Sequence, residues 1–307
     1  MSDNKPTFVF FGTDEFSVQV LETLREDNLI PSLIITVPDK PKGRKMVLTP
    51  PPVKTWAEAN EIEVIQPASL THLEVKPPSE LIEKLKVYPV AKNLNFSGTG
   101  AITYNLFLVA SYGQIIPRAI LDLPKNGTLN IHPSLLPKYR GPSPLETVIL
   151  NGDRGTGVTI IKLDAEMDHG PIIAQEKFSL DDKNDFISLR DKSARLGAEM
   201  LIKILPAYLA GEIVPQEQDH SQATLTKKFT KEDGYLNPND TDLVNWRKIL
   251  ALNPWPGAYI LIEKDDLKIR LAVKSAHLDD QGQLIYDRVV PAGKKEMSWS
   301  DFQHGLK

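Results

Sequence analysis

The stretch Thr7-Phe8-Val9-Phe10-Phe11-Gly12-Thr13, followed by an amphipathic run from Phe16 to Leu24, decides the fold. The uninterrupted apolar run is typical of a strand that is buried on both faces, because a strand with one exposed face alternates apolar and polar residues. Gly12 marks a tight turn, and the amphipathic run indicates a helix that packs on the strand. We therefore expect the chain to begin with a strand, a turn and a helix.

The same alternation continues through the first half of the chain. Further strands and helices are predicted, in chain order, at residues 33–37, 53–60, 63–65, 79–86 and 106–111. Strands that alternate with helices form parallel sheets with right-handed crossovers. The sequence therefore predicts an α/β fold with a doubly wound, mostly parallel, Rossmann-like sheet. Residues 87–104 interrupt this alternation, and we interpret them as a surface hairpin.

The second half of the chain changes character. Strands are predicted at residues 156–162 and 172–179, paired as an antiparallel hairpin, and a long amphipathic helix at Phe186–Leu209. Short strands then follow, among them 258–262 and 268–273. We expect a catalytic domain over residues 1–205, a linker over 206–220 that Pro and Gly residues mark, and a small β-rich domain over 221–307.

The composition is that of an ordinary globular protein. Of its 307 residues, 41% are apolar and 25% are charged. The chain contains no cysteine, which excludes disulfides, thiolate catalysis and thiolate metal sites. No apolar run approaches the roughly 20 residues that span a bilayer, and the first residues lack the apolar core of a signal peptide. We expect a cytoplasmic protein with no membrane partner.

Polar residues follow the predicted parallel strands. They are Gly12-Thr13, then Ser111–Gln114, then the run Asn130-Ile131-His132. The carboxyl ends of parallel strands meet at one edge of the sheet, where such folds bind ligands. The first turn has Gly12 alone rather than G-x-G-x-x-G, which argues against a dinucleotide-binding dehydrogenase.

Asn130 and His132 are the strongest candidates for catalysis. They lie two residues apart, so an extended backbone presents both side chains on the same side. Asp168 supplies a carboxylate from a later loop. An amide donor, an imidazole and a carboxylate are suited to acyl transfer, which requires stabilisation of an oxyanion and movement of a proton.

Residues 38–54 form a basic segment within an acidic chain. Five basic residues stand there against Asp39, a local charge of +4, while the whole chain carries −4. A basic segment on an acidic protein indicates a localised site for an anion such as nucleic acid. The alternative is a solvated lysine-rich loop, and charge alone does not decide between the two.

Two motifs resemble a known family. The run Asn130–Gly141, NIHPSLLPKYRG, looks like the signature of the formyltransferases, and Asp168-His169-Gly170-Pro171 resembles that family's D-x-G-P segment. The resemblance implies transfer of a formyl group from 10-formyltetrahydrofolate, a reduced folate, to an amine, without a metal. By the same resemblance Asn130 donates to the formyl oxygen, His132 exchanges protons with the amine, and Asp168 orients the imidazole.

The resemblance also implies where the folate lies. The pterin is expected between the loop after the central strand and the loop that carries Asp168, where exposed backbone groups read its edge and apolar side chains enclose its ring. The expected folate-binding residues are Ser111, Tyr112, Gly113, Gln114, Ile115, Ile116, Asp164 and Met167.

Three further segments select an acceptor. Residues 38–45, 253–258 and 291–298 resemble the members of the family that formylate the methionine carried by initiator tRNA, whose small C-terminal domain is an OB-like barrel. The basic segment is then expected to contact the tRNA acceptor stem, and the chain to act as a monomer. The expected substrate and tRNA contacts are Phe11, Gly12, Thr13, Lys40, Lys42, Arg44, Lys45, Ser134, Arg140, Lys294 and Lys295.

The chain departs from the family pattern in places. Few residues separate Pro256 from Pro291, so the barrel is expected to be trimmed. His169 stands where threonine is common, and we expect it to be a solvated loop residue, whereas Trp255 is expected in the core. The alternatives are a sugar-nucleotide formyltransferase, a formyltetrahydrofolate hydrolase, and a catalytically weak RNA-binding relative.

Overall fold

A computed structural model describes residues 6–43, 45–70, 85, 104–264 and 267–305. By its internal packing the chain divides into two compact units. The first unit contains Met1–Pro137, Gly157–Glu176 and Asp191–Ala223, and the second contains Lys138–Thr156, Lys177–Arg190 and Thr224–Lys307.

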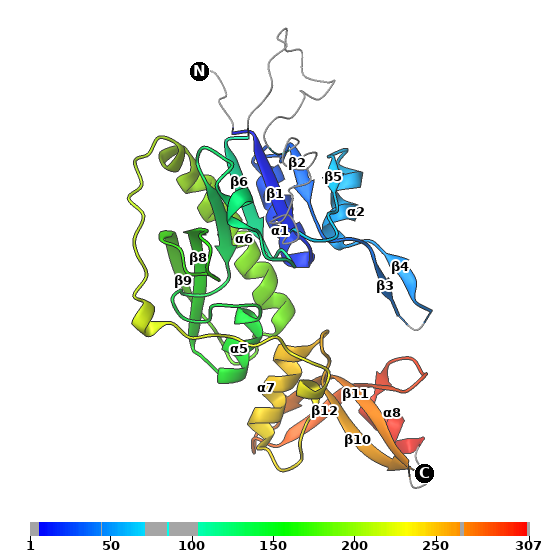
Figure 1. Cartoon of the computed structure of the whole chain (residues 1–307). Coiled ribbons are helices and arrows are strands. Elements are labelled where there is room, and N and C mark those ends of the chain that lie inside the picture. Colours follow the sequence, from blue (N-terminus) through cyan, green and yellow to red (C-terminus); the bar gives the residue numbers. More distant parts are fainter. Residues whose placement is uncertain (1–5, 44, 71–84, 86–103, 265–266, 306–307) are drawn as a thin grey trace. The chain divides into compact units, whose positions relative to one another are not determined.

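A seven-stranded sheet organises the first part of the chain (Figure 1), with the strand order β5-β2-β1-β6-β7-β8-β9. Its strands are β1 (Phe8–Gly12), β2 (Leu33–Ile35), β5 (Val64–Ile65), β6 (Leu106–Ala110), β7 (Thr128–His132), β8 (Gly155–Lys162) and β9 (Ile172–Ser179). The first five pair in parallel, and β8 runs antiparallel to β7. The predicted α/β fold with a mostly parallel sheet is therefore confirmed.

The order of the strands reverses beside β1. The chain passes from β1 to β2 and β5 on one side, and then returns to place β6 on the other side. Every residue of β1 and β6 is buried, as their uninterrupted apolar sequences predict. The carboxyl ends of β1 and β6 therefore border the point where open sheets of this kind form a crevice.

Helices cover the sheet. They are α1 (Glu15–Glu26), α2 (Pro52–Ala59), the short α4 (Arg118–Leu121) and α6 (Phe186–Leu209). A Cβ atom placed on Gly197 of α6 would clash with Cγ2 of Ile131, so glycine at this position lets the helix approach β7 closely. α6 continues through Pro206, the position at which we expected the linker to begin.

One apolar core lies on the β1–β6 part of the sheet. Buried side chains from β1, β2 and β6 pack there with Leu70, Leu85, Tyr104 and Ile120. Leu85 is the one described residue of the predicted helix at 79–86, and Tyr104 is the one described residue of the predicted hairpin at 87–104. Those two predictions otherwise lie outside the described residues.

The basic segment folds into a two-stranded hairpin rather than a loop. β3 (Lys40–Lys42) pairs antiparallel with β4 (Val47–Thr49), and the pair extends away from the sheet as a separate arm (Figure 1). At its base Nζ of Lys54 lies 2.9 Å from Oδ2 of Asp39. The side chains of Met46, Val47 and Leu48 on this arm are exposed.

The second unit contains a four-stranded antiparallel sheet in the order β10-β11-β12-β13. The elements of this unit are α5 (Pro144–Asn151), the 3-10 turn η3 (Glu232–Gly234), α7 (Asp242–Leu252), β10 (Tyr259–Lys264), β11 (Leu267–Leu278), β12 (Leu284–Pro291), β13 (Met297–Ser298) and α8 (Trp299–His304). The predicted C-terminal β-rich part is confirmed. A short turn joins β11 directly to β12, in agreement with the small number of residues between Pro256 and Pro291.

Trp255 contradicts its predicted place in the core. Its side chain is 59% exposed. The core of this sheet is filled by other apolar side chains, among them Leu236, Ile249 and Leu271. Trp299, at the beginning of α8, packs against that core and makes an edge contact with Tyr286. The prediction for Trp255 was therefore wrong.

Candidate active site

Three neighbouring strands end at the same edge of the sheet. β1, β6 and β7 are parallel, and their last residues are Gly12, Ala110 and His132. The residues predicted to carry the chemistry follow these strands or lie at their ends. The candidate site is therefore built at the ends of three buried strands.

Asn130 and His132 lie at the end of β7. Asn130 is 8% exposed and His132 is 4% exposed, although both side chains are polar. They pair with Ile161 and Thr159 of β8, which fixes the extended backbone. Because side chains alternate along a strand, both project from the same face of the sheet. Buried polar side chains at a sheet edge require partners there.

Asp168 is that shared partner. Nδ2 of Asn130 donates to Oδ1 of Asp168 at 3.4 Å, and Nδ1 of His132 lies 3.5 Å from the same oxygen. The backbone of Asp168 has φ 51°, the left-handed region that residues other than glycine rarely adopt. The structure thus brings the three predicted catalytic side chains to one point.

Asn130 and His132 each carry a further polar group besides the one that contacts Asp168. The two distances exceed the roughly 2.6–3.2 Å of a tight catalytic hydrogen bond, and such bonds commonly shorten when substrate binds. The amide of Asn130 has a second N–H, which can donate to an oxyanion. His132 turns Nδ1 toward the carboxylate, and Nε2 is the ring nitrogen suited to exchange a proton with a substrate.

Local hydrogen bonds shape the loop that carries Asp168. Oδ1 of Asp164 accepts a hydrogen bond from the backbone N–H of Glu166 at 2.9 Å, and Oδ2 lies 2.7 Å from Nδ1 of His169. The ring of His169 also stacks on that of His220, with centroids 4.0 Å apart. His169 is thus half-buried and partnered, so the expectation of a solvated loop residue was wrong.

A polar network joins the turn after β1 to the turn after β6. Ser17 Oγ donates to the carbonyl of Ala110 at 2.6 Å, and Ser111 Oγ donates to Oδ2 of Asp14 at 2.5 Å. The backbone N–H of Gly113 donates to Oγ1 of Thr13 at 3.1 Å. The two turns are therefore held as one wall at the edge of the sheet.

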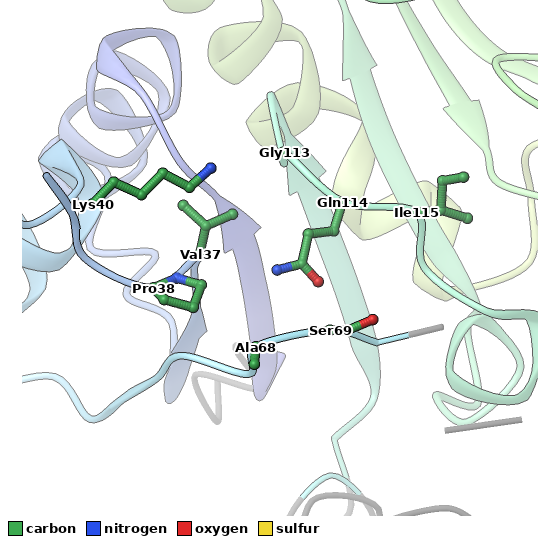
Figure 2. Close-up of a pocket in the computed structure, with 8 residues that line it drawn as sticks. All are labelled: Val37, Pro38, Lys40, Ala68, Ser69, Gly113, Gln114 and Ile115. Carbon is green, nitrogen blue, oxygen red and sulfur yellow. The ribbon is translucent and has the colours of Figure 1, made fainter. Parts of the chain in front are cut away.

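A cavity of about 410 Å³ opens beside this wall. Its lining comes from the segment after β2, from the segment after β5, and from the turn after β6 (Figure 2). Gln114 faces this cavity, but its amide is already bonded to the carbonyl of Pro67 and the N–H of Leu70. The side-chain amide of Gln114 therefore links the turn after β6 to the segment after β5. The lining residues are Val37, Pro38, Lys40, Ala68, Ser69, Gly113, Gln114 and Ile115.

The other expected folate-binding residues differ in exposure. Ile115 and Met167 are exposed, at 68% and 60% respectively, so their side chains are available to a ligand. Ile116 packs partly against the core. The ring of Tyr112 packs edge-on against Phe11, and burial raises the pKa of its hydroxyl above the usual value. Tyr112 is thus a neutral, largely apolar wall.

The residues expected to contact substrate separate into two groups. Phe11, Gly12, Ser134 and Arg140 are buried. Gly12 is enclosed, since a Cβ atom there would lie 2.5 Å from Cε1 of Phe10. Thr13 holds the Gly113 turn. The lysines expected to contact tRNA are exposed, and Arg44 lies outside the described residues. These lysines are Lys40, Lys42 and Lys45 on the hairpin, and Lys294 and Lys295 in the turn after β12.

Sequence reasoning missed Ser17 and Gln218. Asp14 caps α1 and precedes Ser17 by three residues, a signal for a helix start that was available. Gln218 is 5% exposed, and its amide donates to the carbonyls of Asp168 and Gly170. No local pattern marks Gln218, because those carbonyls lie far from it in the sequence.

Within the described part of the chain, no three histidine, aspartate or glutamate side chains are grouped so that they could hold a metal ion. No helix among the described residues is long and apolar enough to cross a membrane.

Comparison with known proteins gives consistent matches. Residues 5–205 match the family model described as formyl transferase. The methionyl-tRNA formyltransferase of Chloroflexus aurantiacus is 42% identical over 269 residues, which cover 87% of this chain and 80% of the relative. The methionyl-tRNA formyltransferase of Bacillus subtilis is 35% identical over 317 residues, which cover 97% of this chain and 94% of the relative.

Solved structures share the fold. A methionyl-tRNA formyltransferase from Clostridium thermocellum superposes with a TM-score of 0.58 at 18% identity, and the match covers 95% of this chain and 99% of that one. A sugar 3N-formyl transferase, solved with dTDP and 5-N-formyl-THF, gives the same TM-score and identity over 94% of this chain and 93% of that one. At such identities the likeness concerns the fold alone.

Proposed function

The chain belongs to the formyl transferase family, and from that premise we propose that it transfers the formyl group of 10-formyltetrahydrofolate to the α-amine of methionyl-tRNA. The observation that carries the chemistry is the convergence of Asn130 and His132 on Oδ1 of Asp168. A carboxylate shared by an amide and an imidazole orients both groups toward one reacting centre.

The proposed reaction is a direct transfer. The neutral α-amine attacks the formyl carbon, and the carbonyl oxygen becomes an oxyanion that the amide of Asn130 stabilises with a hydrogen bond. His132 accepts the proton that the attacking nitrogen releases and returns a proton to N10 of the folate as the C–N10 bond breaks. Asp168 stabilises the imidazolium in between. Formyl-methionyl-tRNA and tetrahydrofolate are the products.

The relatives and the basic hairpin both support methionyl-tRNA as the acceptor. The two curated relatives named above carry the methionyl-tRNA assignment and match most of this chain. The hairpin arm presents Lys40, Lys42 and Lys45 to solvent, where they can meet the phosphates of a tRNA acceptor stem. We propose initiator tRNA as the form recognised, and a monomer as the acting species.

A sugar-nucleotide acceptor has weaker support. The sugar formyltransferase matches at 18% identity, against 42% and 35% for the two curated relatives.

The proposed acceptor, a charged tRNA used in translation, also supports a cytoplasmic location.

The test is acceptor-dependent consumption of the folate donor. The purified protein is supplied with 10-formyltetrahydrofolate, and tetrahydrofolate is measured with and without charged methionyl-tRNA. We expect tetrahydrofolate to appear in equal amount to formyl-methionyl-tRNA, and only when the tRNA is present. Release of formate without tRNA would instead identify a hydrolase, and no turnover under either condition would favour the RNA-binding alternative.

A further inference from the structure

The segment Gln216–His220 contacts the loop that carries the catalytic carboxylate. Residues 206–220 were expected to be a linker. Near the end of that stretch, the backbone of Gln216 exchanges two hydrogen bonds with that of Ile172 at the start of β9, at 2.7 Å and 2.8 Å. We call Gln216–His220 the strap. It is anchored immediately after the Asp164–Gly170 loop ends.

Gln218 makes the central contact of the strap. Its Nε2 donates to the backbone carbonyl of Asp168 at 2.9 Å and to that of Gly170 at 2.8 Å. Gln218 is 5% exposed; its hydrogen bond to Gly170 is buried, and its hydrogen bond to Asp168 is partly buried. One amide group thus bridges the two carbonyls on either side of His169.

The strap meets the same loop a second time through its last residue. The rings of His220 and His169 stack with centroids 4.0 Å apart and an interplanar angle of 2°. His169 in turn lies against Asp164, at the other end of the loop. The strap therefore contacts the last three residues of the loop, and His169 links them to Asp164 at its other end.

We infer that Gln218 is a positioning residue for catalysis, which holds Asp168 where its carboxylate meets Asn130 and His132. The inference rests on the proposed function and extends it to a residue that touches no reacting atom. Its physical basis is the backbone of Asp168, whose φ of 51° persists only if surrounding contacts enforce it. The amide of Gln218 supplies two such contacts, directly on the strained residue and just beyond it.

A purely structural role for Gln218 predicts something different. A residue that only stabilises the fold affects activity through the amount of folded protein, whatever side chain stands at position 168. A positioning residue affects turnover only while Asp168 has a carboxylate to position. A double-substitution cycle between the two positions separates these roles.

Two substitutions at position 218 and one control are needed. Gln218→Leu removes the amide, whereas Gln218→Glu keeps the shape but replaces the N–H donor with an oxygen that faces two carbonyls. Gln222→Leu is the matched control, since Gln222 is exposed and lies outside the strap. Thermal melting measures how much of each variant is folded.

In formyl transfer to methionyl-tRNA, we expect Gln218→Leu and Gln218→Glu to lower kcat by about 10- to 100-fold with KM for the folate little changed, because the misplacement concerns a catalytic group. Gln222→Leu should retain wild-type kcat. In an Asp168→Asn background, Gln218→Leu should lower kcat by less than about twofold. Equal losses in the two backgrounds, or wild-type kcat in Gln218→Glu, would overturn the inference.

A readout without substrate separates failure of this inference from failure of the proposed function. Amide hydrogen exchange of residues 163–171 reports the hold of the strap directly. We expect faster exchange there in Gln218→Leu and Gln218→Glu than in Gln222→Leu, even if the wild-type protein formylates no tRNA. Unchanged hydrogen exchange in this loop would overturn the inference that Gln218 holds it, whatever the acceptor proves to be.

Discussion

Oδ1 of Asp168 lies 3.5 Å from Nδ1 of His132, and these two residues come from different segments of the chain. The same oxygen also accepts from Asn130. β7 fixes the amide and the imidazole, whereas the loop after β8 delivers the carboxylate. The proposed chemistry therefore depends on a loop whose position is set by contacts outside the sheet.

The charge of Asp168 is predicted to matter more than its shape. Asp168→Asn keeps the size of the side chain but removes the carboxylate that stabilises a protonated His132. We expect kcat for formyl transfer to fall by at least about a hundredfold. Asp182→Asn, which changes an exposed carboxylate paired with Arg154, serves as control and should retain activity. Comparable rates in the two variants would contradict the role of Asp168.

Gly170 is predicted to tolerate no side chain. A Cβ atom there would clash with the backbone oxygen of Lys162, which cannot rotate away. We expect Gly170→Ala to destabilise the fold by about 1–3 kcal/mol and to lower activity by moving Asp168. Chemical denaturation measures the first effect. Gly305→Ala is the control, because the nearest atom to its new Cβ lies at an ordinary 3.6 Å. Equal free energies of unfolding for the two variants would contradict the prediction, because the loop would then accommodate the added Cβ atom without cost.

Tyr208 is predicted to make the protein sensitive to alkali. Its hydroxyl donates to the carbonyl of Asn126 at 2.5 Å, and burial raises its pKa to about 12. An exposed phenol ionises at about pH 10. Between these values the unfolded chain gives up a proton that the folded chain keeps, so stability is full below about pH 10 and declines as the pH rises through about 12.

Tyr208→Phe should therefore lessen the decline of stability between about pH 10 and about pH 12. Denaturation curves at several alkaline pH values measure this slope, and the same curves at neutral pH give the cost of the lost hydrogen bond. An unchanged alkaline slope in Tyr208→Phe would assign the decline to other groups.

The lysines of the hairpin are predicted to bind tRNA through phosphates. Lys42→Gln should weaken tRNA binding and reduce the slope of log K against log salt by about one, since one counterion fewer is released. Affinity for folate should not change. Lys183→Gln, another exposed lysine, is the control for net charge. If both variants bind with the same slope, the hairpin is a solvated arm and not a tRNA contact.

Much of the fold follows from the sequence because local patterns and tertiary structure agree. β1 and β6 are apolar without interruption and are fully buried in the sheet. α5 begins at Pro144 and ends before Gly152 in the left-handed conformation, and both residues are local signals of helix ends. α7 follows a capping residue, Thr241. These two helices were therefore predictable from the sequence, although we expected neither of them.

The site was predictable to the extent that it depends on short spacing. The period of two along a strand is enough to place Asn130 and His132 on one face of β7. The left-handed backbone of Asp168, the bridge from Gln218 and the stack of His169 on His220 all depend on residues far apart in the chain. Such contacts follow from tertiary packing, and no periodicity encodes them.

The most direct test of the account is a competition between two amines. The purified protein receives 10-formyltetrahydrofolate and equal concentrations of initiator methionyl-tRNA and a dTDP-linked amino sugar, and both formylated products are measured. The account predicts that formyl-methionyl-tRNA forms and that the sugar is left unmodified. Formylation of the sugar in preference to the tRNA would contradict it.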